Sequence, residues 1–105
     1  MRRKQRASNT TINLTHLAYK VFVRRFRRSP AETPNALAYV EYIDDNSCAL
    51  YLPEKSMPGD IAHELVHVLQ KICLARNMQF TLEQEHMAYL MHYMMGRITG
   101  YRYDV

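Results

Sequence analysis

Cysteine is scarce in this chain, which has 2 cysteines among 105 residues, Cys48 and Cys73. They lie in separate apolar stretches, and neither has a second cysteine close by in the sequence. This pattern predicts neither a disulfide framework nor a cysteine-based zinc site. We expect both residues to be buried free thiols.

Long hydrophobic runs are missing as well. No window approaches the ~20 consecutive apolar residues of a membrane-spanning helix, and the N-terminal segment is charged and then polar, without the apolar core of a secretory signal. No internal repeat or low-complexity tract occurs in the sequence. We therefore expect a cytoplasmic protein that has no membrane partner.

The remaining composition is typical of one small folded domain. Hydrophobic residues make up 48% of the chain and charged residues 23%, as in ordinary globular proteins, and 105 residues leave room for one core. Residues 1–12 are basic and rich in Ser, Thr and Asn, without a hydrophobic period. We predict a flexible arm over residues 1–12 and a single domain over residues 13–105.

Positive charge is concentrated near the N-terminus. The formal net charge is +4, and more than half of the 14 Lys and Arg residues lie in the first 28 positions. Such clustering can mark contact with nucleic acid or with an acidic protein. A basic tail together with one solvated helix face is the more ordinary interpretation.

The predicted fold class is α+β, in the order helix, hairpin, helix, helix. Residues 14–26 have apolar positions spaced three and four apart, which favours an amphipathic helix over a strand. Residues 36–43 and 48–52 are rich in Tyr, Val, Ile and Leu and flank a polar turn at 44–47, which predicts a β-hairpin. We expect the hairpin to cover the helix that follows, because two strands alone are marginal in water.

Two further helices are predicted after Pro53, which ends the second strand. Ser56 can cap the first of them, Pro58 fits its first turn, and the helix should continue to about residue 77. Its apolar stripe consists of Ile61, Leu65, Val68, Leu69 and Ile72. The segment Thr81-Leu82-Glu83-Gln84 matches a capping box and predicts a last helix to about residue 99, before Gly100.

The segment His63-Glu64-Leu65-Val66-His67 carries the strongest chemical signal. Two imidazoles one helical turn apart can bind the same tetrahedral ion, and His63 and His67 both point away from the apolar stripe. Glu64 is set about 100° around the helix from His63, where it can take a proton from a metal-activated water. The segment predicts a zinc site, and the competing interpretation is two surface histidines on an ordinary helix.

A hydrolytic zinc site normally has three protein ligands and one position open to water. The last predicted helix offers Glu83, Glu85, His86 and His92. Glu85 shares a helical face with the small residues Ala88 and Gly96, which would let this helix approach the first one closely. Glu85 is therefore favoured as the third ligand, while Glu83 and His92 stay open as alternatives.

The motif followed by Glu85-His86-Met87-Ala88 resembles the gluzincin arrangement of zinc metallopeptidases. Over about residues 36–98 the chain is most similar to the compact zincins encoded by bacteriophages and to the ImmA/IrrE-type metallopeptidases. The resemblance implies a minimal zincin-like fold in which His63, His67 and Glu85 bind Zn2+ and Glu64 is the general base. It implies hydrolysis of peptide bonds by a zinc-bound water, with a peptide or protein as substrate.

The resemblance also concerns residues 48–52, and the chain departs from it at Tyr89. Related zincins pair their substrate with an exposed edge strand before the motif helix, a place that residues 48–52 would take here. Larger gluzincins often carry an acid at the position of Tyr89. We therefore consider Tyr89 and His92 as groups that could orient a ligand or stabilise an oxyanion. His16 and His86 show no signal of a partner.

A binding protein is the alternative function. In that interpretation the chain is a non-catalytic phage or plasmid protein that keeps zinc only as a structural brace. The arginine-rich N-terminal half would then hold nucleic acid or an acidic protein, and phosphate contacts would make the affinity fall steeply with salt.

Overall fold

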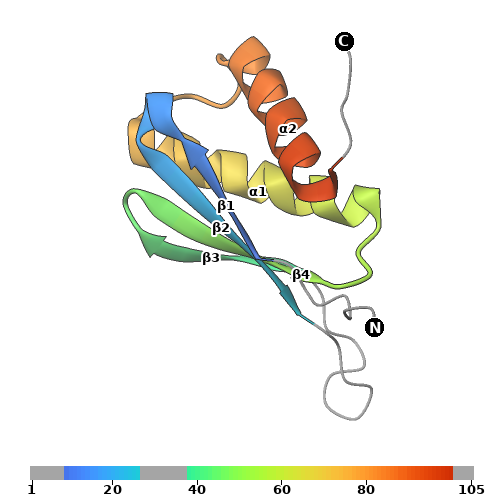
Figure 1. The fold of residues 1–105 in the computed structure, drawn as a ribbon. Coiled ribbons are helices and arrows are strands. Elements are labelled where there is room, and N and C mark those ends of the chain that lie inside the picture. The colour runs from blue at the N-terminus through green and yellow to red at the C-terminus, as the bar shows by residue number, and fades with distance from the viewer. Residues whose placement is uncertain (1–8, 27–37, 101–105) are drawn as a thin grey trace, which may run out of the picture.

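The structure, a computed structural model, describes residues 9–26 and 38–100 of the chain. It is a small α+β domain with a mixed sheet and two helices (Figure 1). The elements in chain order are β1 (Thr10–Leu14), the 3-10 turn η1 (Thr15–Leu17), β2 (Tyr19–Phe26), β3 (Tyr39–Asp44), β4 (Ser47–Pro53), α1 (Pro58–Arg76) and α2 (Gln84–Thr99).

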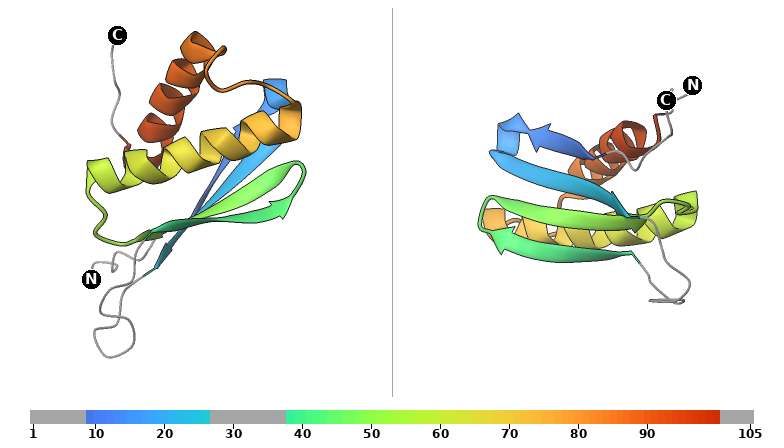
Figure 2. Two further views of the ribbon diagram at one scale, coloured as in Figure 1. Left: turned by 180° about the vertical axis from the view of Figure 1, so that it is seen from behind. Right: turned by 60° about the horizontal axis from the view of Figure 1, so that its bottom comes forward.

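The sheet has four strands in the order β1-β2-β4-β3. Two antiparallel hairpins, β1–β2 and β3–β4, meet where β2 and β4 run parallel in the middle of the sheet. The right-hand view of Figure 2 shows that α1 and α2 lie on the same side of the sheet, so that neither of the two described helices covers its other face.

The predicted helix over residues 14–26 is wrong. The segment forms the end of β1, the turn η1 and the central strand β2, and a left-handed Ala18 (φ 53°) connects η1 to β2. In β2 the side chains alternate, with Tyr19, Val21 and Val23 buried. These are β-branched or aromatic residues, which suit a pleated surface, and pairing with β4 outweighs the weak local helical period.

The prediction of a flexible arm is wrong for residues 10–12. Strand β1 begins at Thr10 and pairs with β2, so residues 10–12 belong to the sheet. Residues 1–8 lie outside the part of the chain that the structure describes.

The predicted hairpin is confirmed as β3 and β4, although residues 36 and 37 lie outside the described part. The connecting turn is tighter than expected, because Asp44 and Ser47 already belong to the strands. The Asp44 carboxylate accepts hydrogen bonds from the Asn46 backbone N–H (2.8 Å) and the Ser47 hydroxyl (2.8 Å), and these bonds lower the pKa of Asp44.

The expectation that residues 48–52 form an exposed edge is wrong. Strand β4 pairs with β2 on one side and β3 on the other, and the edge strands are β1 and β3. The near-continuous burial of β4 agrees with this interior place, since Leu50 and Leu52 are fully buried.

Helix α1 follows the prediction closely. It begins at Pro58 and ends at Arg76, with a left-handed Asn77 as its C-terminal cap. The predicted cap Ser56 instead donates its hydroxyl hydrogen bond to the Pro53 carbonyl (2.7 Å), and Met57 occupies the N-cap. None of the described helices is both long and apolar enough to cross a membrane.

Helix α2 starts later than the capping-box pattern predicts. Its first residue is Gln84, its N-cap is Glu83, and it ends as expected before Gly100, whose φ of 80° is the left-handed value that glycine adopts easily. The Gln84 amide donates to the Thr81 carbonyl (3.1 Å) in the connecting turn.

One hydrophobic core fills the space between the sheet and the helices. Helix α1 packs on β3 and β4, and α2 packs on α1 and β1. Both cysteines are free and buried in the described structure, as the sequence predicts. The buried core residues include Ile12, Tyr19, Val21, Cys48, Leu50, Leu52, Leu65, Val68, Leu69, Ile72, Leu90 and Met94.

Candidate metal centre

The predicted apolar stripe of α1 is buried, and this fixes the direction of the two histidines. Because Leu65 and Leu69 face the core, the positions of His63 and His67 lie on the opposite side of the helix, where both residues are exposed. Their ring centroids are 5.2 Å apart, and the ring planes meet at 70°. Two imidazoles one turn apart are thus open to an ion from solvent.

Gln70, one turn further along the same exposed face, is a partner of His67. The Nδ1 of His67 and the Oε1 of Gln70 are 3.1 Å apart. Because an amide oxygen only accepts, Nδ1 must be the donor in this contact, which leaves the Nε2 lone pair of a neutral His67 free to bind a metal. A hydrogen bond to the second ring nitrogen is the usual way in which proteins orient a metal-binding histidine.

Glu64 is half-buried on the flank of α1 between the core side and the histidine side. Its backbone position adjoins His63, but its side chain leaves the helix about 100° away from that of His63. The Glu64 side chain therefore starts next to the two imidazoles but is not directed toward the point where both would bind one ion.

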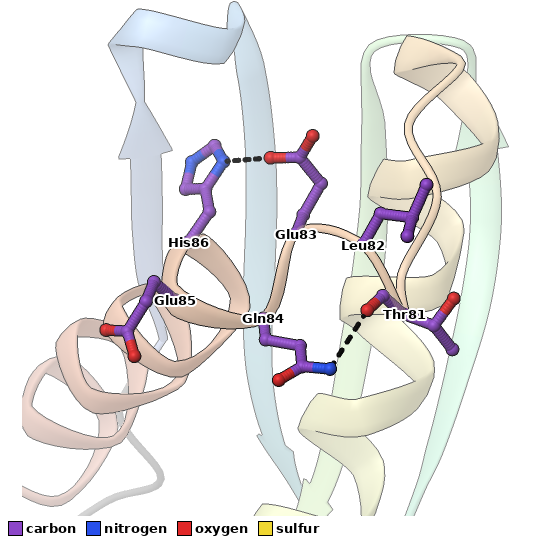
Figure 3. A pocket seen from close by; sticks show the side chains of 6 residues that line it. All are labelled: Thr81, Leu82, Glu83, Gln84, Glu85 and His86. Carbon is purple, nitrogen blue, oxygen red and sulfur yellow. Dashed lines mark hydrogen bonds and ion pairs between the residues drawn. The ribbon is translucent and has the colours of Figure 1, made fainter.

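Glu85 does not lie with the two histidines. It is exposed at the second position of α2, and in Figure 3 its side chain points away from the ribbon of α1. The two helices touch through Cys73 and Met87, whose sulfur atoms are 3.6 Å apart. His67 precedes Cys73 by about 9 Å along the axis of α1, so the start of α2 is displaced from the motif.

The face of α2 that packs in the core also differs from the expectation. Met87, Leu90 and Met94 are buried, whereas Ala88, which we expected to allow close approach to α1, is exposed. Within residues 9–26 and 38–100, no three His, Cys, Asp or Glu side chains gather closely enough to hold a metal ion.

The other candidate residues on α2 are spread around the helix. Glu83 is the N-cap, with one carboxylate oxygen 3.8 Å from Nδ1 of His86. His92 is half-buried, and Tyr89 is 72% exposed. The structure thus supplies two motif histidines and a neighbouring carboxylate, without a third ligand beside them in the described residues.

A second pair of histidines in contact was not predicted from the sequence. The Nε2 atoms of His16, in η1, and His86, in the first turn of α2, are 3.1 Å apart. The two positions are separated by 70 residues, and only the packing of α2 beside the β1–β2 connection joins them, so no local pattern could reveal the contact. Residues 81–86 line a shallow pocket of about 550 Å³ next to this pair (Figure 3).

Comparison with known proteins adds no family: no protein-family model, curated protein or solved structure matches this chain. The function of the chain is therefore inferred from its residues and their geometry.

Proposed function

We propose that this chain is a zinc-dependent peptidase in which His63 and His67 bind the metal and Glu64 is the general base. The observation that carries the proposal is the placement of both motif histidines on the exposed side of a helix whose opposite side is locked in the core. When bound there, zinc would act as a Lewis acid and lower the pKa of a water molecule.

The residues of the chain have separate roles in this proposal. Gln70 holds His67 by its Nδ1, so that the ring need not lose rotational freedom when the metal binds. Glu64 receives the proton from the attacking water, a task that requires a carboxylate close to the metal but outside its ligand set. Glu85 remains the predicted third ligand, and it would reach the histidines only if the first turns of α2 moved along α1.

The substrate in this proposal is an extended peptide bound at strand β3. Since β4 is interior, β3 is the edge strand on the side of the sheet where α1 packs. Its backbone can pair with an additional strand, and such pairing gives affinity with little dependence on the peptide sequence. The charges of Asp44 and Asp45 at the end of the hairpin would favour a basic peptide.

The test is a comparison of wild type with Glu64→Gln at equal zinc occupancy, using a mixed peptide library. The variant keeps the shape of the side chain and leaves the histidines in place, and we expect cleavage to fall by at least ~10²-fold because the proton acceptor is lost. Glu54→Gln, the same change in the turn between β4 and α1, should leave the rate unchanged. Cleavage that persists in Glu64→Gln would overturn the assignment of the base.

Nucleic-acid binding is the second candidate function, and one structural feature favours it. The face of the sheet without helices carries Phe22, Arg24, Tyr51 and Tyr39, because these residues alternate with buried ones in paired strands. The Arg24 guanidinium lies 5.4 Å from the Phe22 ring centroid, and the rings of Tyr39 and Tyr51 stack at 4.7 Å.

Aromatic rings interleaved with cations form a surface on which unpaired bases can stack. Lys20 adds a second cation to this face, while Glu41 adds one acid, whose hydrogen bond raises the pKa of Tyr51. In this alternative the chain binds single-stranded nucleic acid, with an affinity that falls as salt rises. Titration of a labelled single strand at two salt concentrations tests it, and salt-independent binding would contradict it.

A further inference from the structure

The contact between His16 and His86 brings two metal-binding groups together outside the motif helix. Their Nε2 atoms are 3.1 Å apart, and their ring centroids lie 5.3 Å apart at an angle of 45°. Neither residue belongs to the proposed peptidase site. The pair therefore needs an explanation of its own.

The separation of the two nitrogens suits a shared cation. Zinc binds imidazole nitrogens at about 2.0–2.1 Å in tetrahedral sites, which puts two such nitrogens on the order of 3.3 Å apart. Without a metal, one ring can donate a single N–H···N hydrogen bond to the other across the same gap. A metal ion can replace that proton with little movement of either ring.

The second ring nitrogen of His86, Nδ1, also has a partner of the kind found in metal sites. A carboxylate oxygen of Glu83 lies 3.8 Å from Nδ1 of His86, within ion-pair distance, and Figure 3 marks this contact. Carboxylates beside the second ring nitrogen orient metal-binding histidines and raise their basicity. The adjoining pocket is lined by Glu83 and Glu85 among others, so the surroundings favour a positive ion.

Both histidines are carried by fixed parts of the fold. The Arg76 guanidinium donates to the carbonyls of Leu17 (2.7 Å) and Ala18 (3.0 Å), which ties the turn that holds His16 to the end of α1. His86 precedes Met87, which is buried against Cys73. The two rings are therefore held close before any ion arrives, which lowers the entropic cost of binding.

We propose that His16 and His86 form a second metal site, for a borderline divalent ion such as Zn2+, Ni2+ or Cu2+, separate from the motif histidines. Imidazole suits these ions, and the remaining coordination positions are filled by water at this exposed surface. A bound ion joins the β1–β2 connection to the start of α2 and so stabilises the folded chain. This inference does not depend on the proposed peptidase function.

The experiment uses the full chain with His63→Ala and His67→Ala, so that the motif helix contributes no ligand. Thermal unfolding is followed while Zn2+ or Ni2+ is added. A metal that binds only the folded state should raise Tm by on the order of 10 °C at a hundredfold excess over its dissociation constant. Adding His16→Ala or His86→Ala should abolish the rise, whereas adding Thr15→Ala, in the same exposed turn, should preserve it.

A rise in Tm that survives His16→Ala, or no rise at all in the chain that lacks only the motif histidines, would overturn the inference. Calorimetric titration of the otherwise unchanged chain gives a second measurement that does not depend on the double variant. There, His16→Ala should lower the number of zinc ions bound per chain by one, while peptide cleavage that depends on Glu64 continues. Loss of cleavage alone would count against the peptidase proposal and not against this site.

Discussion

At the scale of single residues, the geometry of one helix was enough to predict the directions of the motif histidines but not the place of Glu85. The directions of His63 and His67 depend only on the burial of residues two positions away in the same helix, such as Leu65 and Leu69, because two positions are about 200° apart around the helix. The place of Glu85 depends on how one helix packs on another, where the Met87 side enters the core and the Glu85 side is left exposed.

The third-ligand proposal can be tested by comparing two neighbouring acids. If α2 shifts to complete the site when zinc binds, Glu85→Ala should weaken zinc affinity by at least tenfold, or ~1.4 kcal/mol, relative to Glu83→Ala. Calorimetric zinc titration measures both variants in a His16→Ala background, so that zinc binding at the proposed second site beside Glu83 does not contribute. Equal affinities, or a larger loss in Glu83→Ala, would remove Glu85 from the ligand set.

At the scale of elements, Arg76 connects the end of α1 to both hairpins. Besides the carbonyls in the β1–β2 connection, its guanidinium donates to the Asp45 carbonyl (3.1 Å) and the Asn46 side-chain oxygen (2.9 Å) in the β3–β4 turn. It also lies over the Tyr19 ring, 5.5 Å from the centroid. One side chain thus satisfies acceptors from two turns that are far apart in sequence.

Replacing Arg76 should therefore loosen both turns together. We expect Arg76→Ala to lower the free energy of unfolding by about 1–3 kcal/mol, because several carbonyls lose a charged donor and the cation leaves the Tyr19 ring. Urea unfolding followed by circular dichroism measures the change. Lys71→Ala, which removes a half-buried cation from the same helix, should cost less than ~1 kcal/mol, and an equal loss in both variants would contradict this role of Arg76.

At the scale of the whole molecule, the described part of the chain forms two layers, and its helices cover only one face of the sheet (Figure 2). That face bears the aromatic and basic side chains of the second candidate function, whereas the motif histidines lie beyond α1 on the opposite side of the molecule. The metal-binding residues of the first candidate function and the aromatic and basic residues of the second therefore lie on separate surfaces, and either set can be replaced without touching the other.

Two tyrosines on β3 provide a matched test of the uncovered face. Tyr39 is paired with Tyr51 on that face, while Tyr42 is paired with the buried Cys48 on the helix side; the two are 51% and 60% exposed. If bases stack on the sheet, Tyr39→Ala should weaken binding of a single-stranded oligonucleotide by about tenfold, and Tyr42→Ala should have little effect. Fluorescence anisotropy measures both, and equal effects would exclude this surface.

Local patterns in the sequence determined α1, the hairpin of β3 and β4, the burial of Cys48 and Cys73, and the outward direction of the motif histidines. These features depend on periodicity within one element or on a short turn, so that neighbouring residues are sufficient to specify them. For residues 14–26 the local pattern is ambiguous, because their apolar residues fit both a helical stripe and a strand. Secondary-structure propensity alone is a weak guide in such a case.

Only the tertiary structure decided that β2 is a central strand, that β4 is interior, and which side of α2 enters the core. Parallel pairing of β2 with β4 joins segments that are far apart in the chain, and the pattern within either segment does not show which partner it pairs with. The same reason applies to His16 and His86, whose rings meet because the β1–β2 connection and the start of α2 pack side by side. A candidate site within one helix could therefore be predicted from the sequence, whereas a candidate site shared between elements could be found only from the fold.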